Sequence, residues 1–331
     1  MSRKHSNISV FVPHIGCPNM CSFCNQRHIT GTCKAPHTKD VIDAVKVAVK
    51  TPSYDPSSTE IAFFGGSFTA INRNYMIELL KTASLFVERK VVSGIRISTR
   101  PDAVDPEILD ILKEYNVTSI ELGAQSLNDR VLKMNNRGHT AKDVVKASKL
   151  IKEYGFSLGL QMMTGLYCDD DESSIKTAKE IIDLSPDTVR IYPTIVLKDT
   201  DLAALYADNL YKPQTLDEAV NLASVLLMMF NEANIKVIRL GLHSIEKEAY
   251  IAGPWHPAFS ELCISSLYLK IAKELLKDKG KYILYVNSSS ISKMTGQNRS
   301  NILALKDMGY ECVVKSDDKL KDYEITAQRS E

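Results

Sequence analysis

The sequence predicts an α/β fold built as a partial (β/α)6 barrel of the TIM type, followed by a C-terminal α/β extension. Short apolar stretches alternate six times with stretches whose apolar residues recur every three or four positions, the pattern of a parallel sheet covered by helices. Six units are fewer than the eight of a closed barrel, so we expect an open one. After a first strand near the N-terminus, strands begin at Glu60, Ile95, Ser119, Leu158 and Val189, and helices span about 38–50, 73–88, 105–115, 127–134, 141–154 and 172–183.

A polar stretch at 198–214 gives the clearest boundary in the chain. We expect a core over residues 1–205 and an extension over residues 206–331 that packs on the core, since nothing like a flexible tether separates them. In the extension, the pattern predicts helices at 216–233 and 261–276 and strands at 235–240, 282–286, 310–315 and 322–326.

Size and charge exclude several classes of protein. The 331 residues are 44% apolar, which is ample for one large core, and the net charge of +1 does not by itself indicate nucleic acid. No apolar run reaches the ~18 residues that a membrane span needs. The polar start of the chain lacks the features of a signal peptide. We therefore expect a soluble, cytoplasmic protein with no membrane partner.

Three cysteines, Cys17, Cys21 and Cys24, follow the spacing C-x3-C-x2-C in one short segment. Three thiolates are one fewer than a closed structural zinc site uses. They suit a 4Fe–4S cluster that keeps one iron open for chemistry. The alternative is a zinc ion whose fourth ligand is one of three nearby residues, His14, His28 or Cys33.

The remaining cysteines are scattered and are expected to be free thiols in a reducing cytosol. They are Cys33, Cys168, Cys263 and Cys312. An apolar helical pattern places Cys263 in the core, and Cys168 follows a strand end beside three aspartates. Too few cysteines are left for an obvious second cluster.

Small and polar residues follow the predicted strands at the edge where α/β barrels build their active sites. Glycines at such a turn allow positive φ and let the backbone approach a ligand closely. The residues are Gly65, Gly66, Ser67, Ser98, Gln125 and Gln161, with Arg137 twelve positions after Gln125. The ordinary alternatives are a plain strand-end turn for the glycines, a satisfied amide for Gln125 and a surface ion pair for Arg137.

In this order, these segments resemble the radical S-adenosylmethionine (SAM) superfamily, and Phe23 before the last cysteine fits it too. Over roughly residues 8–262, the resemblance narrows to the family of the elongator catalytic subunit and its bacterial relatives. The segments that carry it are Glu121–Leu127, Arg137–Thr140, Gln161–Leu166, Val189–Val196, Thr200–Leu202, Tyr211–Pro213, Ile238–Leu242 and Ala252–Phe259.

Two departures limit what this resemblance implies. The first two cluster cysteines are closer together here than in the elongator subunit, and the chain ends at Glu331 without room for that subunit's acetyltransferase domain. The family's task, starting the carboxymethylation of wobble uridine in tRNA from acetyl-CoA, is therefore not simply transferred. We expect the closest likeness to short, stand-alone bacterial members.

The resemblance implies a cofactor arrangement and a mechanism. Cys17, Cys21 and Cys24 would bind the cluster, and SAM would occupy the open iron. One electron from an external donor of the flavodoxin or ferredoxin type would cleave SAM to methionine and a 5′-deoxyadenosyl radical, which abstracts hydrogen from the substrate. The residues implied to hold SAM are Gly65, Gly66, Ser67, Ser98, Gln125, Arg137 and Gln161.

Four further residues are candidates for the substrate side: Arg190, Tyr192, Arg239 and His256. With Gln125, three of them, Arg190, Tyr192 and His256, are our candidates for catalytic roles. In Gly253–Pro257, two prolines stiffen a loop around the only tryptophan and a histidine. The alternative is a tryptophan-capped turn that covers the open side of the barrel.

A tRNA or other RNA nucleoside is the leading substrate hypothesis. Residues 270–321 hold eleven Lys and Arg against six Asp and Glu, and the loop Ser292–Asn301 is basic and rich in amides, which suits phosphate contacts. A solvated, lysine-rich helix face is the alternative.

Two other functions remain open. One is a radical SAM oxidoreductase acting on a small molecule or a coenzyme A thioester, because the pattern of Gln125 and Arg137 also resembles oxygen-independent coproporphyrinogen oxidase. The other is a non-catalytic, zinc-stabilised RNA-binding protein.

Overall fold

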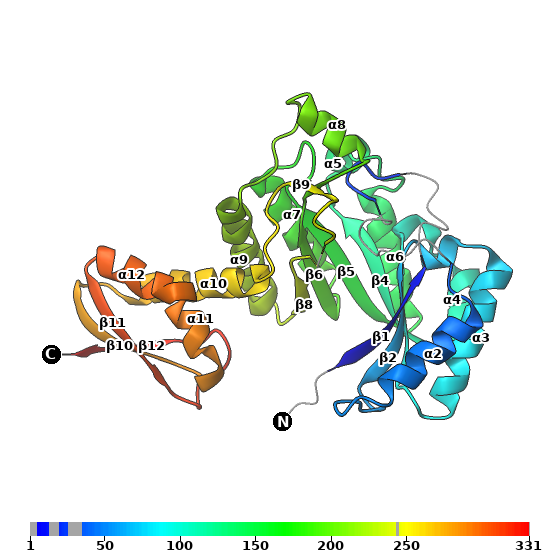
Figure 1. The fold of residues 1–331 in the computed structure, drawn as a ribbon, viewed down its shortest axis with the longest axis horizontal. Coiled ribbons are helices and arrows are strands. Elements are labelled where there is room, and N and C mark those ends of the chain that lie inside the picture. Colours follow the sequence, from blue (N-terminus) through cyan, green and yellow to red (C-terminus); the bar gives the residue numbers. More distant parts are fainter. Residues whose placement is uncertain (1–4, 13–19, 26–34, 243–244, 331) are drawn as a thin grey trace.

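An open, curled sheet with helices on its outer side forms the larger part of the molecule, and a smaller α/β unit lies beside it (Figure 1). The computed structural model describes residues 5–12, 20–25, 35–242 and 245–330. Seven strands pair in the order β1-β2-β3-β4-β5-β6-β8, and all of these pairings are parallel. The predicted α/β class and open barrel are confirmed. The strands are β1 (Ser6–Val12), β2 (Thr59–Gly65), β3 (Gly94–Thr99), β4 (Val117–Gln125), β5 (Ser157–Thr164), β6 (Thr188–Pro193) and β8 (Lys236–Leu240).

Helices connect successive strands, and most of them pack on the outer face of the sheet. They are α2 (Thr38–Ala48), α3 (Arg73–Glu88), α4 (Pro106–Glu114), α5 (Asp129–Met134), α6 (Ala141–Glu153), α7 (Asp171–Asp183) and α9 (Leu216–Glu232). Alternate strand residues such as Ile120 and Leu122 of β4 are buried against these helices in one hydrophobic core. The residues between them, such as Glu121, therefore line the concave face.

Strand β8 pairs with β6 and completes the core sheet. The sequence pattern assigns 235–240 to the extension because the polar stretch at 198–214 reads as a boundary. In the structure, α8 (Asp201–Ala207) occupies part of that stretch. The buried face of α9 joins the core cluster, so the chain returns to the sheet and β8 covers the edge that β6 would otherwise expose.

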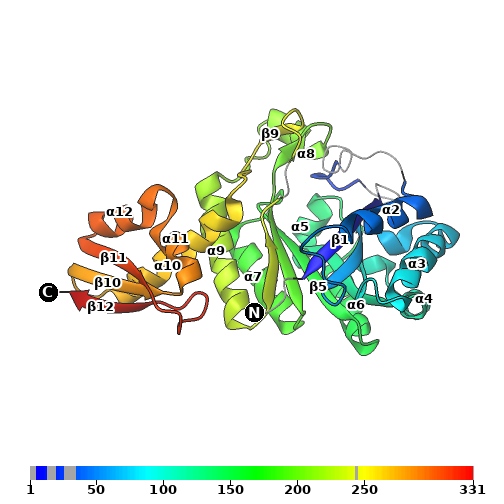
Figure 2. The ribbon, with the colours of Figure 1, turned by 60° about the horizontal axis from the view of Figure 1, so that its bottom comes forward.

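The C-terminal unit contains a small sheet in the order β11-β10-β12. Helix α10 leads to it and contacts the hydrophobic clusters of both units through Ile264 and Ile271. Figure 2 shows the unit beside the barrel from a second direction. Its elements are α10 (Phe259–Leu275), β10 (Gly280–Val286), α11 (Ile291–Thr295), α12 (Ser300–Asp307), β11 (Tyr310–Ser316) and β12 (Thr326–Ser330).

The strand expected at 322–326 is wrong by several residues, since β12 begins at Thr326. Tyr323 has a φ of +68° and donates its backbone N–H to the Tyr268 hydroxyl at 2.9 Å. A residue in that conformation makes a turn rather than a strand.

Several short elements complete the fold. Two brief strands form an antiparallel pair, and four segments are 3-10 turns. They are β7 (Val196–Leu197), β9 (Tyr250–Ala252), η1 (Phe68–Ala70), η2 (Pro101–Ala103), η3 (Ser288–Ser290) and η4 (Gln297–Arg299). Within the ranges that the structure covers, no helix is long and apolar enough to cross a membrane.

Candidate active site

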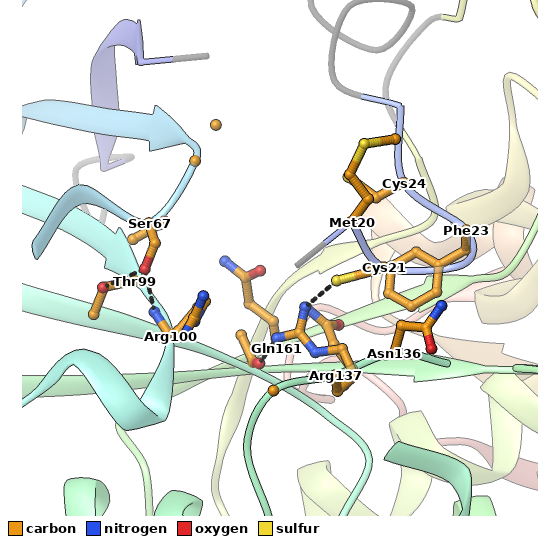
Figure 3. A pocket seen from close by; sticks show the side chains of 16 residues that line it. Met20, Cys21, Phe23, Cys24, Ser67, Thr99, Arg100, Asn136, Arg137 and Gln161 are labelled. Atoms are coloured by element: carbon orange, nitrogen blue, oxygen red, sulfur yellow. Dashed lines mark hydrogen bonds between the residues drawn. The ribbon is translucent and has the colours of Figure 1, made fainter. Parts of the chain in front are cut away.

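A cavity at the C-terminal ends of β2 to β5 brings together the residues implied to bind the cluster and SAM (Figure 3). The expected residues on its wall are Cys21, Cys24, Gly65, Gly66, Ser67, Ser98, Gln125, Arg137 and Gln161. Cys17 lies outside the described residues. Sequence reasoning missed Met20, Thr99, Arg100, Gly123, Asn136 and Gly138, which also line the cavity.

The turn after β2 requires glycine at its first position. Gly65 has a φ of +111°, and a Cβ there would lie 2.8 Å from the carbonyl oxygen of Val12. The Gly66 N–H donates to that same oxygen at 2.7 Å. Backbone from β1 and β2 therefore meets at this edge of the cavity with no side chain in between, which allows a ligand to approach the main chain.

Ser67 ties this turn to the end of β3. Its Oγ accepts the backbone N–H of Arg100 at 3.0 Å and lies 3.0 Å from Oγ1 of Thr99. Thr69 also bonds to Thr99 and to the carbonyl of Ala103. The Ser67 hydroxyl is thus already engaged, and it positions the Gly-Gly turn on the cavity wall.

Three buried polar atoms on the cavity wall have no hydrogen-bond partner among the described residues: Ser98 Oγ, Gln125 Oε1 and Arg137 Nε. A buried polar atom without a partner costs about 1–3 kcal/mol, so a cluster of them indicates a polar ligand. Gln125 also has a φ of +64°, which is uncommon for a residue with a side chain. The wall therefore fits a ligand with amine, carboxylate and hydroxyl groups, as SAM has.

Arg137 joins the cavity wall to the cysteine loop. Its Nη1 donates to Cys21 Sγ at 3.1 Å, and its Nη2 donates to the carbonyl of Gly123 at 2.6 Å (Figure 3). Behind it, burial and the charge of Arg137 lower the pKa of His139 to about 4. His139 is therefore neutral near pH 7, and its Nε2 bonds to the Ala124 carbonyl at 3.1 Å.

Asn135, which sequence reasoning missed, anchors the cysteine loop. Its Oδ1 accepts the Ser22 hydroxyl at 2.9 Å, and its carbonyl accepts the Ser22 N–H at 3.1 Å. Its Nδ2 donates to the carbonyls of Tyr167 and Val131. Phe23 packs beside this anchor in a small apolar cluster with Tyr167 and others. The only sequence signal is a polar run, 135–137, between two helices.

A buried ionic network crosses the concave face below the cavity. Arg96 of β3 donates to Glu60 of β2 at 2.8 Å and to Glu121 of β4 at 3.1 Å. Burial alone would raise the pKa of Glu60, but hydrogen bonds from His5 and Thr118 and the charge of Arg96 outweigh it and lower the pKa to about 2. Glu60 is therefore ionised at any pH near neutrality.

The network continues toward the substrate-side candidates. Glu121 accepts Arg190 Nη2 at 2.6 Å and Gln161 Nε2 at 2.9 Å. Arg190 also stacks on the Phe64 ring, 5.2 Å from its centre, and lies 3.5 Å from the Tyr192 hydroxyl. Burial alone would lower the pKa of Arg190, but the Glu121 carboxylate raises it above its ordinary value.

The other two substrate-side candidates, Arg239 and His256, do not line the cavity. Arg239 is the register partner of Arg190 on β8, and its Nε donates to the Gly241 carbonyl at 3.1 Å. His256 does not line the cavity: its Nδ1 accepts the N–H of Ala258 at 3.1 Å in the turn before α10. Trp255 packs with Tyr250 and a small apolar cluster, as the capped-turn alternative expects.

Three other cysteines and the basic loop Ser292–Asn301 lie outside the cavity. Cys263 and Cys312 are buried, and burial raises their pKa values to about 12 and about 11. The core position expected for Cys263 is confirmed. Cys168 is exposed and does not line the cavity. In the basic loop, Asn301 is buried and donates to Ser265, so its amide does not face solvent as a phosphate contact would require.

The family comparison identifies the class. The model of the radical SAM superfamily matches residues 11–181, and that of the radical SAM C-terminal domain matches residues 186–268. The chain belongs to the radical SAM superfamily and is a radical SAM enzyme, whose cofactors are a 4Fe–4S cluster and SAM. This membership favours the cluster over zinc at the cysteine loop.

Within that class, the chain resembles elongator complex protein 3. It is 30% identical over 185 residues to the tRNA uridine(34) acetyltransferase of Methanocaldococcus jannaschii, covering 50% of this chain and 34% of that protein. It is 27% identical over 201 residues to elongator complex protein 3 of Saccharomyces cerevisiae, covering 55% and 36%. The chain thus spans about a third of the length of these relatives.

Solved structures agree on the fold. The archaeal Elp3 of Methanocaldococcus infernus superposes with a TM-score of 0.67 at 21% identity, covering 83% of this chain and 65% of that one. Streptococcus suis SuiB bound to S-adenosylmethionine superposes with a TM-score of 0.51 at 16% identity, covering 73% and 52%.

Proposed function

We propose that this radical SAM enzyme modifies a nucleoside of tRNA by abstracting a hydrogen atom from it. The observation that carries the proposal is the similarity to two relatives named tRNA uridine(34) acetyltransferase, at 30% and 34% identity. The polar concave face beside the cavity supports it, since a nucleoside offers hydrogen-bond donors and acceptors. The acetyl transfer of those relatives is not part of the proposal.

In this proposal, Cys17, Cys21 and Cys24 hold the cluster. The Gly65–Gly66 turn, the three polar atoms that lack partners and Gln161 would hold SAM. When bound, the two groups would supply the radical chemistry that removes a hydrogen atom from the substrate. The chain's own contribution is positioning.

Charges of this chain would position both the cofactor and the substrate. The Arg137 guanidinium beside Cys21 offsets part of the negative charge of the thiolates. Arg190 and Tyr192 would orient the substrate from the concave face, with Glu121 and Phe64 fixing the arginine side chain. We retain Gln125 and His256 as candidates for the same step, although His256 would have to act from the turn before α10.

The test is anaerobic reconstitution followed by dithionite reduction with SAM, with and without bulk tRNA. We expect about four irons per chain and formation of 5′-deoxyadenosine that tRNA stimulates. Nuclease-digested tRNA is the control, and mass spectrometry of nucleosides from the treated tRNA identifies the product. SAM cleavage that tRNA leaves unchanged, with no altered nucleoside, would contradict the tRNA substrate but not the radical SAM assignment.

One observation favours a second candidate, a small anionic substrate such as a coenzyme A thioester. Arg190 and Arg239 occupy paired positions on β6 and β8, and no ion pair between described residues involves Arg239. Two neighbouring guanidinium groups suit a phosphate or a carboxylate. Stimulation of 5′-deoxyadenosine formation by acetyl-CoA in the absence of tRNA would favour this candidate.

A further inference from the structure

A second hollow lies on the outer surface, next to the cavity, and we name it the outer groove. Four residues, Met20, Asn136, Arg137 and Gly138, line both the cavity and the outer groove. Arg137 reaches from this shared wall to Cys21, with Nη1 3.1 Å from the sulfur. A single layer of residues therefore separates a cluster-ligand cysteine from the outer surface.

Exposed cations surround the outer groove. Lys133 lines it, Arg130 lies beside Lys133 on the exposed side of α5, and Lys142 lies in the first turn of α6. Among the ion pairs of the described ranges, none involves these three side chains. They are therefore available to a partner.

Three acids nearby accept hydrogen bonds. Asp129 accepts the N–H of Ala141 at 2.7 Å, Asp143 accepts the N–H of Thr140 at 2.8 Å, and Asp201 accepts the amide of Asn136 at 3.1 Å. These bonds offset part of their charge, and the three acids face four cations, the three named above and Arg137. The surface around the outer groove is positive on balance and suits an acidic partner.

The apolar part of this surface consists of methionines. Met20 is 65% exposed and Met134 is 41% exposed. Methionine is flexible and polarisable, which suits a protein contact that forms and releases. Of the described residues that line the groove, none is a tyrosine, phenylalanine or tryptophan on which a base could stack.

We propose that the outer groove, with Arg130, Lys133 and Lys142 around it, is the docking surface for a small acidic one-electron carrier protein of the ferredoxin or flavodoxin type. Reductive cleavage of SAM needs one electron from outside the chain, and the rate of electron transfer between proteins falls steeply with distance. The reduced carrier loses one electron, and the cluster beside Cys21 gains it. No proton or group moves in this step.

RNA is also acidic, but it fits this surface less well. Our proposed function places the substrate at the concave face of the sheet. The outer groove instead lies between α5 and α6, and α6 packs on the outer face through Val144, Ala147 and Ile151. None of the described residues that line the outer groove belongs to the concave face, where we place the substrate.

The test compares two charge reversals with the same spacing and the same change of charge. One replaces Arg130→Glu and Lys133→Glu on α5. The control replaces Lys176→Glu and Lys179→Glu on the exposed face of α7. A bacterial-type ferredoxin, reduced photochemically, is the probe. Its affinity for the SAM-free protein is measured at low and high salt, and the rate at which it reduces the cluster is followed by stopped flow.

We expect the α5 reversal to weaken ferredoxin binding and to slow ferredoxin-driven reduction by about tenfold or more at low salt, with a smaller difference at high salt. The α7 control should match the unmodified protein. Dithionite needs no docking, so 5′-deoxyadenosine formation driven by dithionite should change by less than about twofold in either variant.

Four results would overturn the proposal. The α5 reversal could leave ferredoxin binding and reduction unchanged, or the α7 control could weaken them equally. The α5 reversal could also lose tRNA binding while keeping ferredoxin binding, in which case the surface is an RNA contact. A flavodoxin is tested in parallel, and failure of both carriers to bind the unmodified protein would equally overturn the proposal.

Discussion

Cys21 lies where the cysteine loop, the cavity and Arg137 meet. The C-x3-C-x2-C spacing identifies it as a ligand candidate without any structure. The hydrogen bond from Arg137, which is 116 positions away in the chain, becomes visible only in the fold. A guanidinium beside a ligand sulfur offsets charge that three thiolates bring to one cluster, so Arg137 serves both the cluster and the SAM pocket in our proposal.

We predict that Cys21→Ala abolishes cluster binding, because two thiolates are too few to hold a cubane cluster. Iron and sulfide per chain should fall to background after anaerobic reconstitution, and SAM cleavage should vanish with them. Cys168→Ala is the matched control, since that cysteine is exposed and lies outside the cavity, and it should load iron normally. A Cys21→Ala protein that keeps a full cluster would show that the ligand assignment is mistaken.

At the scale of elements, the described part of the cysteine loop, residues 20–25, is held by contacts from two distant segments. Asn135 bonds to Ser22, and the Leu202 N–H donates to the Ser22 carbonyl at 2.8 Å. Asn25 donates to the Lys198 carbonyl at 3.2 Å. The polar stretch at 198–214, which the sequence presents as a boundary, thus helps to seat the loop.

We predict that Asn135→Ala destabilises the protein by about 2–3 kcal/mol, because Asn135 is fully buried and its loss leaves several polar groups without partners. Iron should also leave the reconstituted protein faster when a chelator is added. Asn136→Ala is the control: Asn136 is exposed and makes one side-chain bond, to Asp201 at 3.1 Å, so the cost should stay below about 1 kcal/mol. Equal effects in urea unfolding would argue against an anchoring role.

At the scale of the whole molecule, the ionic network joins strands β2, β3, β4 and β6 across the concave face. Arg96 lies between Glu60 and Glu121, and all three side chains are buried. Removing one partner from such a group leaves an uncompensated charge, which costs about 3–5 kcal/mol. The stability of the sheet is therefore sensitive to the loss of a single carboxylate.

The stability that the Glu60 carboxylate contributes to this network depends on pH. The pKa of Glu60 is lowered to about 2 in the folded protein from an ordinary value of 4.5, so its contribution is complete above about pH 4.5 and is lost as the pH falls toward 2. We predict that Glu60→Gln removes about 2 kcal/mol of the loss of stability between pH 7 and pH 3. The measurement is urea unfolding of the apo-protein over that pH range.

The control for that experiment is Glu107→Gln. Glu107 pairs with Arg73 at 2.9 Å on the surface, where an ion pair contributes about 0–1 kcal/mol. Its pH profile should run parallel to that of the unmodified protein. A Glu60→Gln profile that is also parallel would mean that the network does not favour the ionised carboxylate.

The sequence by itself determined the α/β class, most helix positions, the cysteine motif and many of the residues that line the cavity. These follow from information local in the chain: apolar periodicity, the spacing of thiols, and small or polar residues after each strand. Gly65 is a clear case, since a glycine pair at a strand end already indicates a tight turn that a ligand can approach.

Only the tertiary structure decided that β8 completes the core sheet, that Asn135 anchors the cysteine loop and that Asn301 is buried. It also decided the ionic network and the outer groove. Each of these depends on contacts between segments far apart in the chain, where burial and hydrogen-bond satisfaction select the partner. The local periodicity of the sequence does not show which distant segments will pack together, so the sequence alone does not predict these contacts.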